Sequence, residues 1–293
     1  MPSRNPNSLL LAFFGIIVIS GSVYVAVRLS NFELPPFWGA GLRFSVSSIL
    51  FIAIVAMRRI ALPRGKALLG ALVYGVLGFG ASNAFFYYAL VNVQAGLTSV
   101  IFALVPLSTL FLASAQNQEH LGLRGIMGAL VALAGTAIVF QAQLTSRIPL
   151  LSLLALAGAI LCSAETSIAL KHFPQSDPFA TLAVAMTTGS LMLLALSALV
   201  GEAWLLPVQP TTSIAFAYLV LVGSASSVLY LYVLSGWTAT ATNYSFVLVP
   251  IVTVLLAALF EGEVVNLAFI AGSALVLLGV YLGALFRVGK PSR

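Results

Sequence analysis

The chain has 293 residues, of which 61% are hydrophobic and only 7% are charged, and its formal net charge is +6. A soluble globular protein carries about 25% charged residues, so this composition excludes a soluble enzyme, a soluble nucleic-acid binder and a disordered chain. The single cysteine, Cys162, excludes a disulfide framework and a cysteine-rich metal site. We therefore expect an integral membrane protein that holds no metal and no cofactor.

Ten apolar stretches, each long enough to cross a bilayer as a helix of about 20 residues, follow one another along the chain. They cover residues 8–28, 36–57, 67–90, 95–115, 122–141, 149–170, 178–200, 212–234, 239–260 and 264–286. The loops at 91–94 and 235–238 are so short that the spans they join must form tight antiparallel hairpins. The sequence predicts an all-α polytopic membrane protein with ten transmembrane helices.

The basic residues give the orientation of these helices. Ten spans place both termini on the same side, and that side contains ten of the 13 Lys and Arg residues. The opposite side contains Arg28 and Arg147, and Arg43 falls inside the second span. Because loops rich in Lys and Arg stay in the cytoplasm, we expect both termini to be cytoplasmic. This distribution accounts for the positive net charge without any nucleic-acid partner.

The second half of the chain repeats the first. A shift of 144 residues aligns 104–140 with 248–284 without a gap, and 12 of these 37 positions are identical. The shared positions include Pro106 with Pro250, Glu119 with Glu263, Gly128 with Gly272 and Gly135 with Gly279. Each repeat, residues 1–145 and 146–293, contains five spans. Because five is an odd number, the second repeat enters the membrane from the opposite side, as in secondary transporters that work by alternating access.

This doubled pattern of a proline, a loop glutamate and two glycines resembles the ten-helix EamA-type members of the drug/metabolite transporter superfamily. The start of the second span, Pro35–Trp38 followed by Arg43, also resembles the family's first repeat, whereas the second repeat has Pro178–Phe179 and no arginine. The run Phe85–Tyr88 after Asn83 is most similar to the YddG-type exporters of aromatic and other amino acids. The resemblance implies a secondary transporter of the bacterial inner membrane that is not an enzyme.

Polar and aromatic side chains within the spans predict a substrate cavity that would stack an apolar side chain and hydrogen-bond a zwitterion. One helical stripe of the third span contains Phe79, Asn83, Phe86, Tyr87 and Leu90. The candidate substrate-binding residues are Ser20, Tyr24, Phe79, Asn83, Tyr87, Ser99, Ser163, Tyr230, Asn243 and Tyr244. The alternative is that such residues form interfacial belts and pack helices against one another.

Two charges lie inside spans, where charges are costly. Glu165 is the candidate for proton coupling or for binding a substrate ammonium, and its alternative is a structural glutamate bonded to Ser163 or Thr166. The sequence favours a structural role for Arg43, in which the guanidinium caps carbonyl groups or reaches toward the membrane surface.

Two further features concern the movement and packing of the spans. The matched prolines Pro106 and Pro250 are candidate gate or hinge residues, with static kinks as the alternative. Gly128 with Gly135, and the Gly279–Gly283 motif, are expected to pack helices closely rather than to touch substrate.

The sequence therefore favours a secondary transporter that exports amino acids or related small metabolites. A transporter of drug or metabolite cations, or of nucleoside or sugar derivatives, is the nearest alternative. An intramembrane enzyme or a receptor is the more distant one, and the sequence has no Walker A motif, no His-Glu-x-x-His and no Gly-x-Ser-x-Gly. The expected partners are a small-molecule substrate and the lipid bilayer. Because both halves are in one chain, a monomer suffices, and a homodimer stays open.

Overall fold

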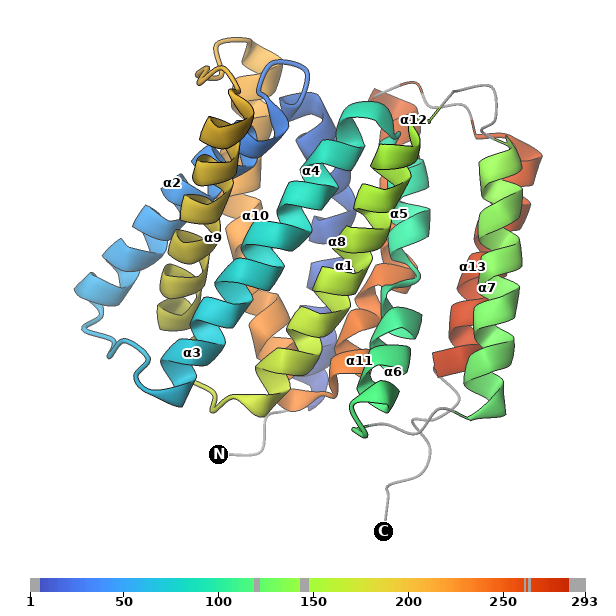
Figure 1. Ribbon diagram of the computed structural model, residues 1–293, viewed down its shortest axis with the longest axis horizontal. Coiled ribbons are helices and arrows are strands. Elements are labelled where there is room, and N and C mark those ends of the chain that lie inside the picture. Colours follow the sequence, from blue (N-terminus) through green and yellow to red (C-terminus); the bar gives the residue numbers. More distant parts are fainter. Residues whose placement is uncertain (1–5, 119–121, 143–147, 261, 263–264, 285–293) are drawn as a thin grey trace.

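The computed structural model describes residues 6–118, 122–142, 148–260, 262 and 265–284, which form helices and connecting loops (Figure 1). The elements are α1 (Pro6–Ser30), α2 (Pro36–Met57), α3 (Lys66–Val73), η1 (Tyr74–Ala81), α4 (Ser82–Asn92), α5 (Ala95–Phe102), α6 (Val105–Ala115), α7 (Leu123–Ala142), α8 (Leu150–His172), α9 (Pro178–Val200), α10 (Pro210–Gly236), α11 (Ala239–Asn243), α12 (Ser245–Phe260) and α13 (Leu267–Ala284).

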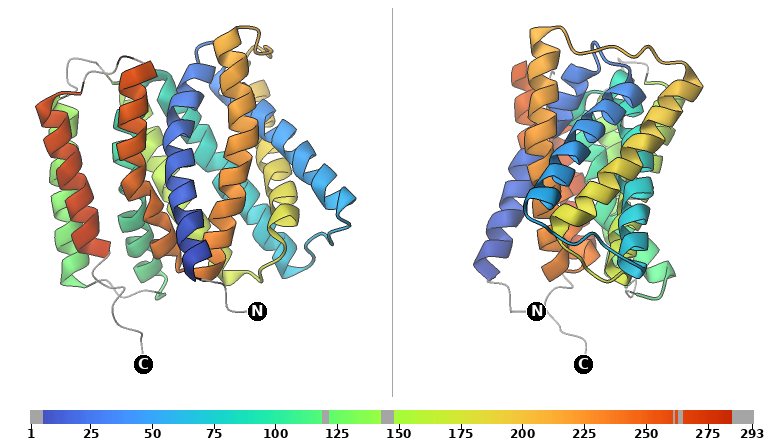
Figure 2. Two further views of the ribbon diagram at one scale, coloured as in Figure 1. Left: turned by 180° about the vertical axis from the view of Figure 1, so that it is seen from behind. Right: turned by 90° about the vertical axis from the view of Figure 1, so that its left-hand side faces the viewer.

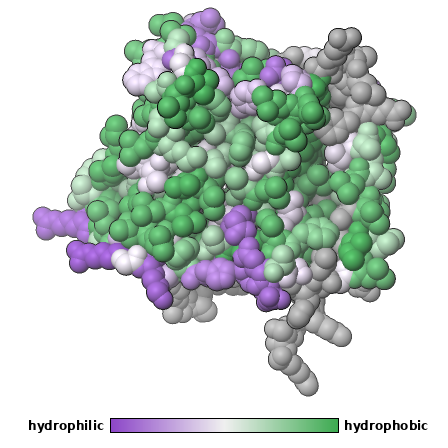
Figure 3. Space-filling model, in the orientation of Figure 1, coloured by the Kyte–Doolittle hydropathy of each residue, from purple (hydrophilic) through white to green (hydrophobic). Residues whose placement is uncertain are grey.

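The helices correspond to the ten predicted spans. Eight helical stretches of the described chain are long and apolar enough to cross a membrane, and shorter apolar stretches lie in α7 and α13. The third span combines α3, η1 and α4, the fourth combines α5 and α6, and the ninth combines α11 and α12. Apolar side chains cover the middle of the face in Figure 3, and hydrophilic ones gather toward its ends. The predicted all-α membrane fold is confirmed.

The packing of the helices shows the inverted repeat directly. The first span (α1) packs on the eighth span (α10). The repeat relates the first span to the sixth and the eighth to the third, and the sixth (α8) packs on α4 of the third in the same way. The pairs α2 with α9 and α7 with α13 each map onto themselves when the halves are exchanged, and α7 and α13 stand side by side in Figures 1 and 2. The first turn of α1 and the last turn of α13 lie at the same end of the bundle. The predicted division at residues 145 and 146 lies outside the described residues.

The glycines of α7 and α13 bring this pair into backbone contact. A Cβ atom on Gly135 would lie 2.7 Å from the carbonyl oxygen of Gly272, and one on Gly279 would lie 2.6 Å from that of Gly128. These two contacts are equivalent because both pairs of glycines are related by the shift of 144 residues. The expected packing role of Gly128, Gly135 and Gly279 is therefore seen in the structure. Glu119 and Glu263, the other matched pair, lie outside the described residues.

The two spans that contain the matched prolines are interrupted differently. In the first half α5 ends at Phe102, and Pro106 stands in the first turn of α6, where its missing N–H costs no helical hydrogen bond. In the second half the interruption falls at Tyr244, and Pro250 lies inside the continuous helix α12. The two halves thus have different local structures at their prolines, and a gate or hinge role for Pro106 and Pro250 stays a prediction.

A π-helical segment, η1, lies in the middle of the third span. It contains Gly75, Gly78 and Gly80, and a Cβ atom on Gly75 would lie 2.6 Å from the carbonyl oxygen of Ala185 on α9. The absence of side chains on these glycines lets α9 and α8 approach η1 closely. Wide turns of this kind interrupt α-helices mostly near functional sites, and η1 forms part of the wall of the central cavity.

Candidate functional site

A cavity of about 210 Å³ lies between the two halves of the bundle. It is formed by α1, α2, η1, α4 and α5 from the first half and by α8, α10 and α12 from the second half. Six of the ten predicted substrate-binding residues line it: Ser20, Tyr24, Phe79, Asn83, Ser163 and Tyr230. The cavity has the mixture expected of a small-molecule site, a largely apolar wall with a few polar groups.

Most of the lining residues are related in pairs by the internal repeat. At shifts of 143 or 144 residues, residues that line the cavity in the first half correspond to residues that line it in the second. These pairs are Ser20 with Ser163, Val23 with Thr166, Phe79 with Gly223, Ser82 with Ser226, Asn83 with Ser227, Phe86 with Tyr230, and Phe102 with Phe246. The cavity therefore lies on the pseudo-two-fold axis that relates the halves.

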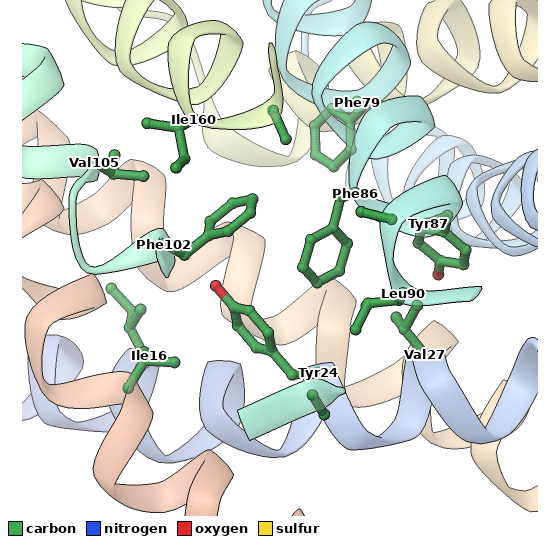
Figure 4. Close-up of a cluster of buried hydrophobic side chains, with 14 of the residues drawn as sticks. Ile16, Tyr24, Val27, Phe79, Phe86, Tyr87, Leu90, Phe102, Val105 and Ile160 are labelled. Carbon is green, nitrogen blue, oxygen red and sulfur yellow. The ribbon is translucent and has the colours of Figure 1, made fainter. Parts of the chain in front are cut away.

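Aromatic rings form one wall of the cavity. Tyr24 meets Phe86 and Phe102 edge-on, with ring centroids 5.0 and 5.8 Å away, and Phe86 and Phe102 are themselves 5.2 Å apart (Figure 4). Phe102 also contacts its counterpart Phe246 at 6.3 Å. Interlocked rings of this kind make a rigid apolar surface on which a planar or branched side chain can pack.

Hydroxyl and amide groups form the polar part of the lining. Ser20 on α1 hydrogen-bonds Ser226 on α10 at 3.3 Å, and Ser82 on α4 hydrogen-bonds Ser163 on α8 at 2.7 Å. The Asn83 amide nitrogen donates to the Gly78 carbonyl at 2.8 Å. Each serine pair joins one half of the molecule to the other, so these hydrogen bonds hold the two halves together at the cavity.

The other predicted residues lie behind the cavity wall or beside it. Tyr87 is fully buried and its hydroxyl accepts a 2.8 Å hydrogen bond from the guanidinium of Arg43, which lines the cavity. Ser99 is buried and donates to the Gly96 carbonyl in its own helix. Tyr244 is buried and is not among the lining residues. Tyr87, Ser99 and Tyr244 are thus not part of the cavity lining, and their contact with substrate stays a prediction.

Asn243 is a buried hub next to the cavity. Its side-chain oxygen accepts a hydrogen bond from Tyr230 at 3.0 Å, and its amide nitrogen donates to Thr109 at 2.9 Å and to Ser167 at 2.7 Å. The hub joins α11 to α6, α8 and α10. Because Tyr230 lines the cavity and Asn243 does not, Asn243 supports the cavity wall through Tyr230.

Glu165 does not line the cavity. Gln116, at the end of α6, donates from its amide nitrogen to both carboxylate oxygens of Glu165, at 3.0 and 2.8 Å. The alternative partners named from the sequence are bonded elsewhere, Ser163 to Ser82 and Thr166 to the Cys162 carbonyl. Glu165 is thus a half-buried residue near one end of the bundle, and its coupling role stays a prediction.

Several lining residues were missed at the level of sequence. The candidate residues did not include Tyr74, Phe102, Thr166 and Ser245, which all line the cavity. Phe86, which belongs to the predicted stripe of the third span, lines it as well. The glycine-rich run of η1 was a usable signal for Tyr74, since three glycines in six residues are unusual inside a span. Phe102 had another signal, because its counterpart Phe246 lies beside the polar run of the ninth span.

At the end of the bundle opposite α1's first turn, two carboxylates tie the loops of different halves together. Glu202, in the loop after α9, accepts hydrogen bonds from the backbone N–H groups of Phe37 and Trp38 in the first turn of α2, at 3.1 and 2.6 Å. Glu33, in the loop before α2, accepts from the backbone of Val208 and Gln209 at the start of α10. These carboxylates satisfy free N–H groups of helix N-termini.

Two tryptophan rings also join these loops, and hydrogen bonds from the loop before α10 lower the pKa of Glu33. Trp38 stacks on Trp204 with centroids 4.9 Å apart. Partial desolvation alone would raise the pKa of Glu33, but hydrogen bonds from Val208, Thr212 and Gln209 outweigh it and lower the pKa below its ordinary value. We call these two carboxylates and the stacked tryptophans the loop tie. It joins the two halves at this end.

A comparison with known protein families decides the class of the molecule. The model of the EamA-like transporter family matches residues 7–141 and matches again at residues 150–284. The chain belongs to the EamA-like transporter family. The two matches fall on the two halves whose pairwise contacts and cavity residues are related by the repeat. This EamA-like protein is a membrane transporter, as the family resemblance predicted.

Relatives of this EamA-like protein are similar over nearly their whole length. The inner membrane transporter YedA of Escherichia coli K12 is 29% identical, with 92% of this chain and 91% of YedA covered. A probable amino-acid metabolite efflux pump of Salmonella typhimurium is 25% identical, with 95% of each chain covered. A probable terminal-alkyne amino-acid exporter of Streptantibioticus cattleyicolor is 27% identical, with 91% and 90% covered. These names indicate transporters rather than enzymes.

A solved crystal structure has the same fold. It aligns with a TM-score of 0.71 and 21% identity, over 98% of this chain and all of that chain. At this level of identity the likeness concerns the fold alone.

Proposed function

We propose that this EamA-like protein is a secondary transporter that exports amino acids, aromatic and other, or related small metabolites. The observation that carries the proposal is the cavity between the halves, which combines an aromatic wall with serine hydroxyls and the Asn83 amide. Such a lining suits a molecule with an apolar side chain and a small polar head. The printed names of two relatives, an amino-acid metabolite efflux pump and an amino-acid exporter, support the same substrate class.

The transport mechanism is alternating access between the two inverted halves. Exchange of the roles of two equivalent halves gives two conformations of similar energy, each open to one side. The cavity lies on the axis that relates the halves, so the substrate stays at one place while the helices around it move. Pro106 and Pro250 are the proposed hinge residues, because each stands in a span that is interrupted near the cavity.

The protein works in the bacterial inner membrane with both termini in the cytoplasm. The end of the bundle that contains the first turn of α1 also contains the loop between α2 and α3, with Arg58, Arg59 and Arg64, and the first residue of α3, Lys66. The positive-inside rule assigns this end to the cytoplasm, and the loop tie then faces the external side. One chain contains both halves, so the proposed functional unit is a monomer.

Transport by purified protein in liposomes tests the proposal. Proteoliposomes are loaded with labelled L-phenylalanine, L-leucine or L-threonine, and efflux is compared with that from protein-free liposomes. We expect protein-dependent efflux that is reduced at least tenfold by Asn83→Ala, a cavity residue, in protein that remains monodisperse. The matched control is Ala134→Val, because Ala134 is exposed on α7, away from the cavity. Absence of transport for every amino acid by folded protein would overturn the substrate class.

A further inference from the structure

Arg43 is the only charged residue among the described residues of the cavity lining, and it is almost completely buried. It lines the cavity from α2 with 6% of its surface exposed, and every other described lining residue is uncharged at neutral pH. Its guanidinium donates one hydrogen bond, to Tyr87 at 2.8 Å, and lies over the Phe44 ring with 4.8 Å to the centroid. The Nε atom is buried without a hydrogen-bond partner.

No described acidic residue compensates this charge. Glu33 and Glu202 belong to the loop tie, Glu165 bonds Gln116, and Asp177 caps α9 by accepting from the N–H groups of its first turn. The remaining acidic residues of the sequence are Glu119, Glu261 and Glu263, which lie outside the described residues. A buried cation without a counter-ion is costly, and inside a membrane such a group marks a binding or transport site.

The repeat shows that Arg43 is not required by the fold. Pro36 and Phe37 at the start of α2 correspond to Pro178 and Phe179 at the start of α9, a shift of 142 residues. The same shift places Ala185 opposite Arg43, and α9 packs well in the equivalent position with this small residue. Most of the lining is paired between the halves, so the unpaired arginine is a feature of the site rather than of the architecture.

The second half leaves room for the guanidinium. Gly223 on α10 is the repeat counterpart of Phe79, and a Cβ atom there would overlap the Nη2 atom of Arg43. A side chain at this position would therefore displace the guanidinium from the cavity. Tyr87 binds the Nη1 end of the group and Gly223 lies against Nη2, so the two neighbours hold the guanidinium at the cavity wall, where its Nε atom has no hydrogen-bond partner.

We infer that Arg43 binds the carboxylate of the substrate, which makes this a carrier of monocarboxylates and zwitterions and not of organic cations. The inference rests on the proposed transport function and adds the ligand class to it. A planar guanidinium pairs with a carboxylate through two parallel hydrogen bonds. A single arginine neutralises one negative charge, whereas a phosphate dianion would leave an excess charge in a lining with no second cation among its described residues. The described lining residues include no carboxylate, which likewise disfavours a drug cation.

The test compares free acids with their neutralised analogues. Binding of L-phenylalanine, its amide, and 3-phenylpropionate, which lacks the amine, is measured by the ligand-dependent shift in Tm and by competition for transport. We expect wild-type protein to bind both carboxylates and to bind the amide at least tenfold more weakly. Arg43→Gln should weaken carboxylate binding by about 10- to 100-fold, change amide binding by less than threefold, and so remove the preference for acids. Arg43→Lys should restore part of it.

Two further measurements separate ligand binding from a structural role. Removal of an uncompensated buried charge should leave the Tm of ligand-free Arg43→Gln equal to or above that of the wild type, whereas a structural arginine would lower it. Gly223→Ala keeps the charge and displaces it, and should weaken carboxylate binding while amide binding is retained. An equal loss of acid and amide binding in Arg43→Gln, or a wild type that prefers the amide, would overturn the inference.

The outcomes also distinguish the inference from the proposed function. Binding of 3-phenylpropionate but of no amino acid would contradict amino-acid transport and retain the carboxylate site. Transport of amino acids with no difference between wild type and Arg43→Gln would retain the function and refute the role of Arg43. Binding of neither class of carboxylate would refute both.

Discussion

The hydroxyl groups of Ser82 on α4 and Ser163 on α8 lie 2.7 Å apart across the boundary between the two halves. The internal repeat relates this pair to Ser226 and Ser20, whose hydroxyl groups lie 3.3 Å apart. If the halves exchange roles during transport, the close pair opens and the looser pair closes. The two hydrogen bonds thus report which of the two conformations the protein adopts.

Cross-linking of the close pair should stop transport. In a Cys162→Ala background, Ser82→Cys with Ser163→Cys should form a disulfide under mild oxidation, because the two side chains are already in contact. We expect oxidation to lower the transport rate at least tenfold and reduction to restore it. Each single cysteine variant is the control for loss of one serine. A fully oxidised double variant that transports at the rate of the reduced protein would show that α4 and α8 stay together throughout the cycle.

A side chain added at Gly135 should destabilise the protein, because α7 packs closely on α13 at this position. Its Cβ would lie 2.7 Å from the Gly272 carbonyl oxygen, and a backbone atom cannot move aside as a flexible side chain can. We expect Gly135→Ala to lower the free energy of unfolding by about 1–3 kcal/mol, with a similar loss for Gly279→Ala. The measurement is thermal unfolding in detergent, with the exposed Ala134→Val on the same helix as the control. A Tm equal to that of the control would contradict the contact.

Stability of the loop tie should depend on pH in a defined direction. The native pKa of Glu33 is below its ordinary value of 4.5, so its contribution is complete above that pH and is lost as the pH falls through the native pKa. At pH 7 we expect Glu33→Gln to have a Tm a few degrees below the wild type. The difference should shrink toward zero below pH 4.5, because the glutamine does not titrate. A difference that stays constant from pH 7 to pH 3 would contradict the prediction.

The sequence predicts the spans and the repeat well because both depend on local composition. A bilayer requires continuous apolar helices, and a duplicated chain keeps its prolines and glycines in register. The lining is harder to predict. Within a regular α-helix, Phe86 and Tyr87 project about 60° to one side and about 40° to the other side of Asn83. Only the neighbouring helices decide that Phe86 enters the cavity and that Tyr87 turns to Arg43.

The depth of a charge in a span does not reveal its role. Arg43 and Glu165 both fall inside apolar stretches, and the sequence favours Glu165 as the functional charge and a structural role for Arg43. The structure separates them through partners from distant elements. Gln116, at the end of α6, donates hydrogen bonds to the carboxylate of Glu165. Gly223 on α10 has no side chain, so the guanidinium of Arg43 fits against it in the cavity wall. Contacts between residues that are 49 and 180 positions apart cannot be read from a single sequence.

If Glu165 couples transport to protons, its replacement should affect coupling and not substrate binding. Because Glu165 does not line the cavity, Glu165→Gln should leave substrate binding unchanged. If the carboxylate carries protons, the variant should lose the acceleration of transport by a pH gradient and keep exchange of labelled for unlabelled substrate at the wild-type rate. Gln116→Ala is the companion variant, since it removes the partner and keeps the carboxylate. An unchanged response of Glu165→Gln to the gradient would show that coupling does not use this residue.

Asn243 should support the cavity through Tyr230, and a double-mutant cycle can measure this support. Asn243→Ala leaves the part-buried Tyr230 hydroxyl and the buried Thr109 and Ser167 hydroxyls without their shared partner, which should cost about 2–3 kcal/mol of stability. Tyr230→Phe removes one bond of the same hub and should cost less. Because the two residues share that bond, the double variant should be more stable than the sum of the single losses predicts, by about 0.5–1.5 kcal/mol. Strict additivity would mean that Asn243 and Tyr230 act independently, and the link from the hub to the cavity would then be wrong.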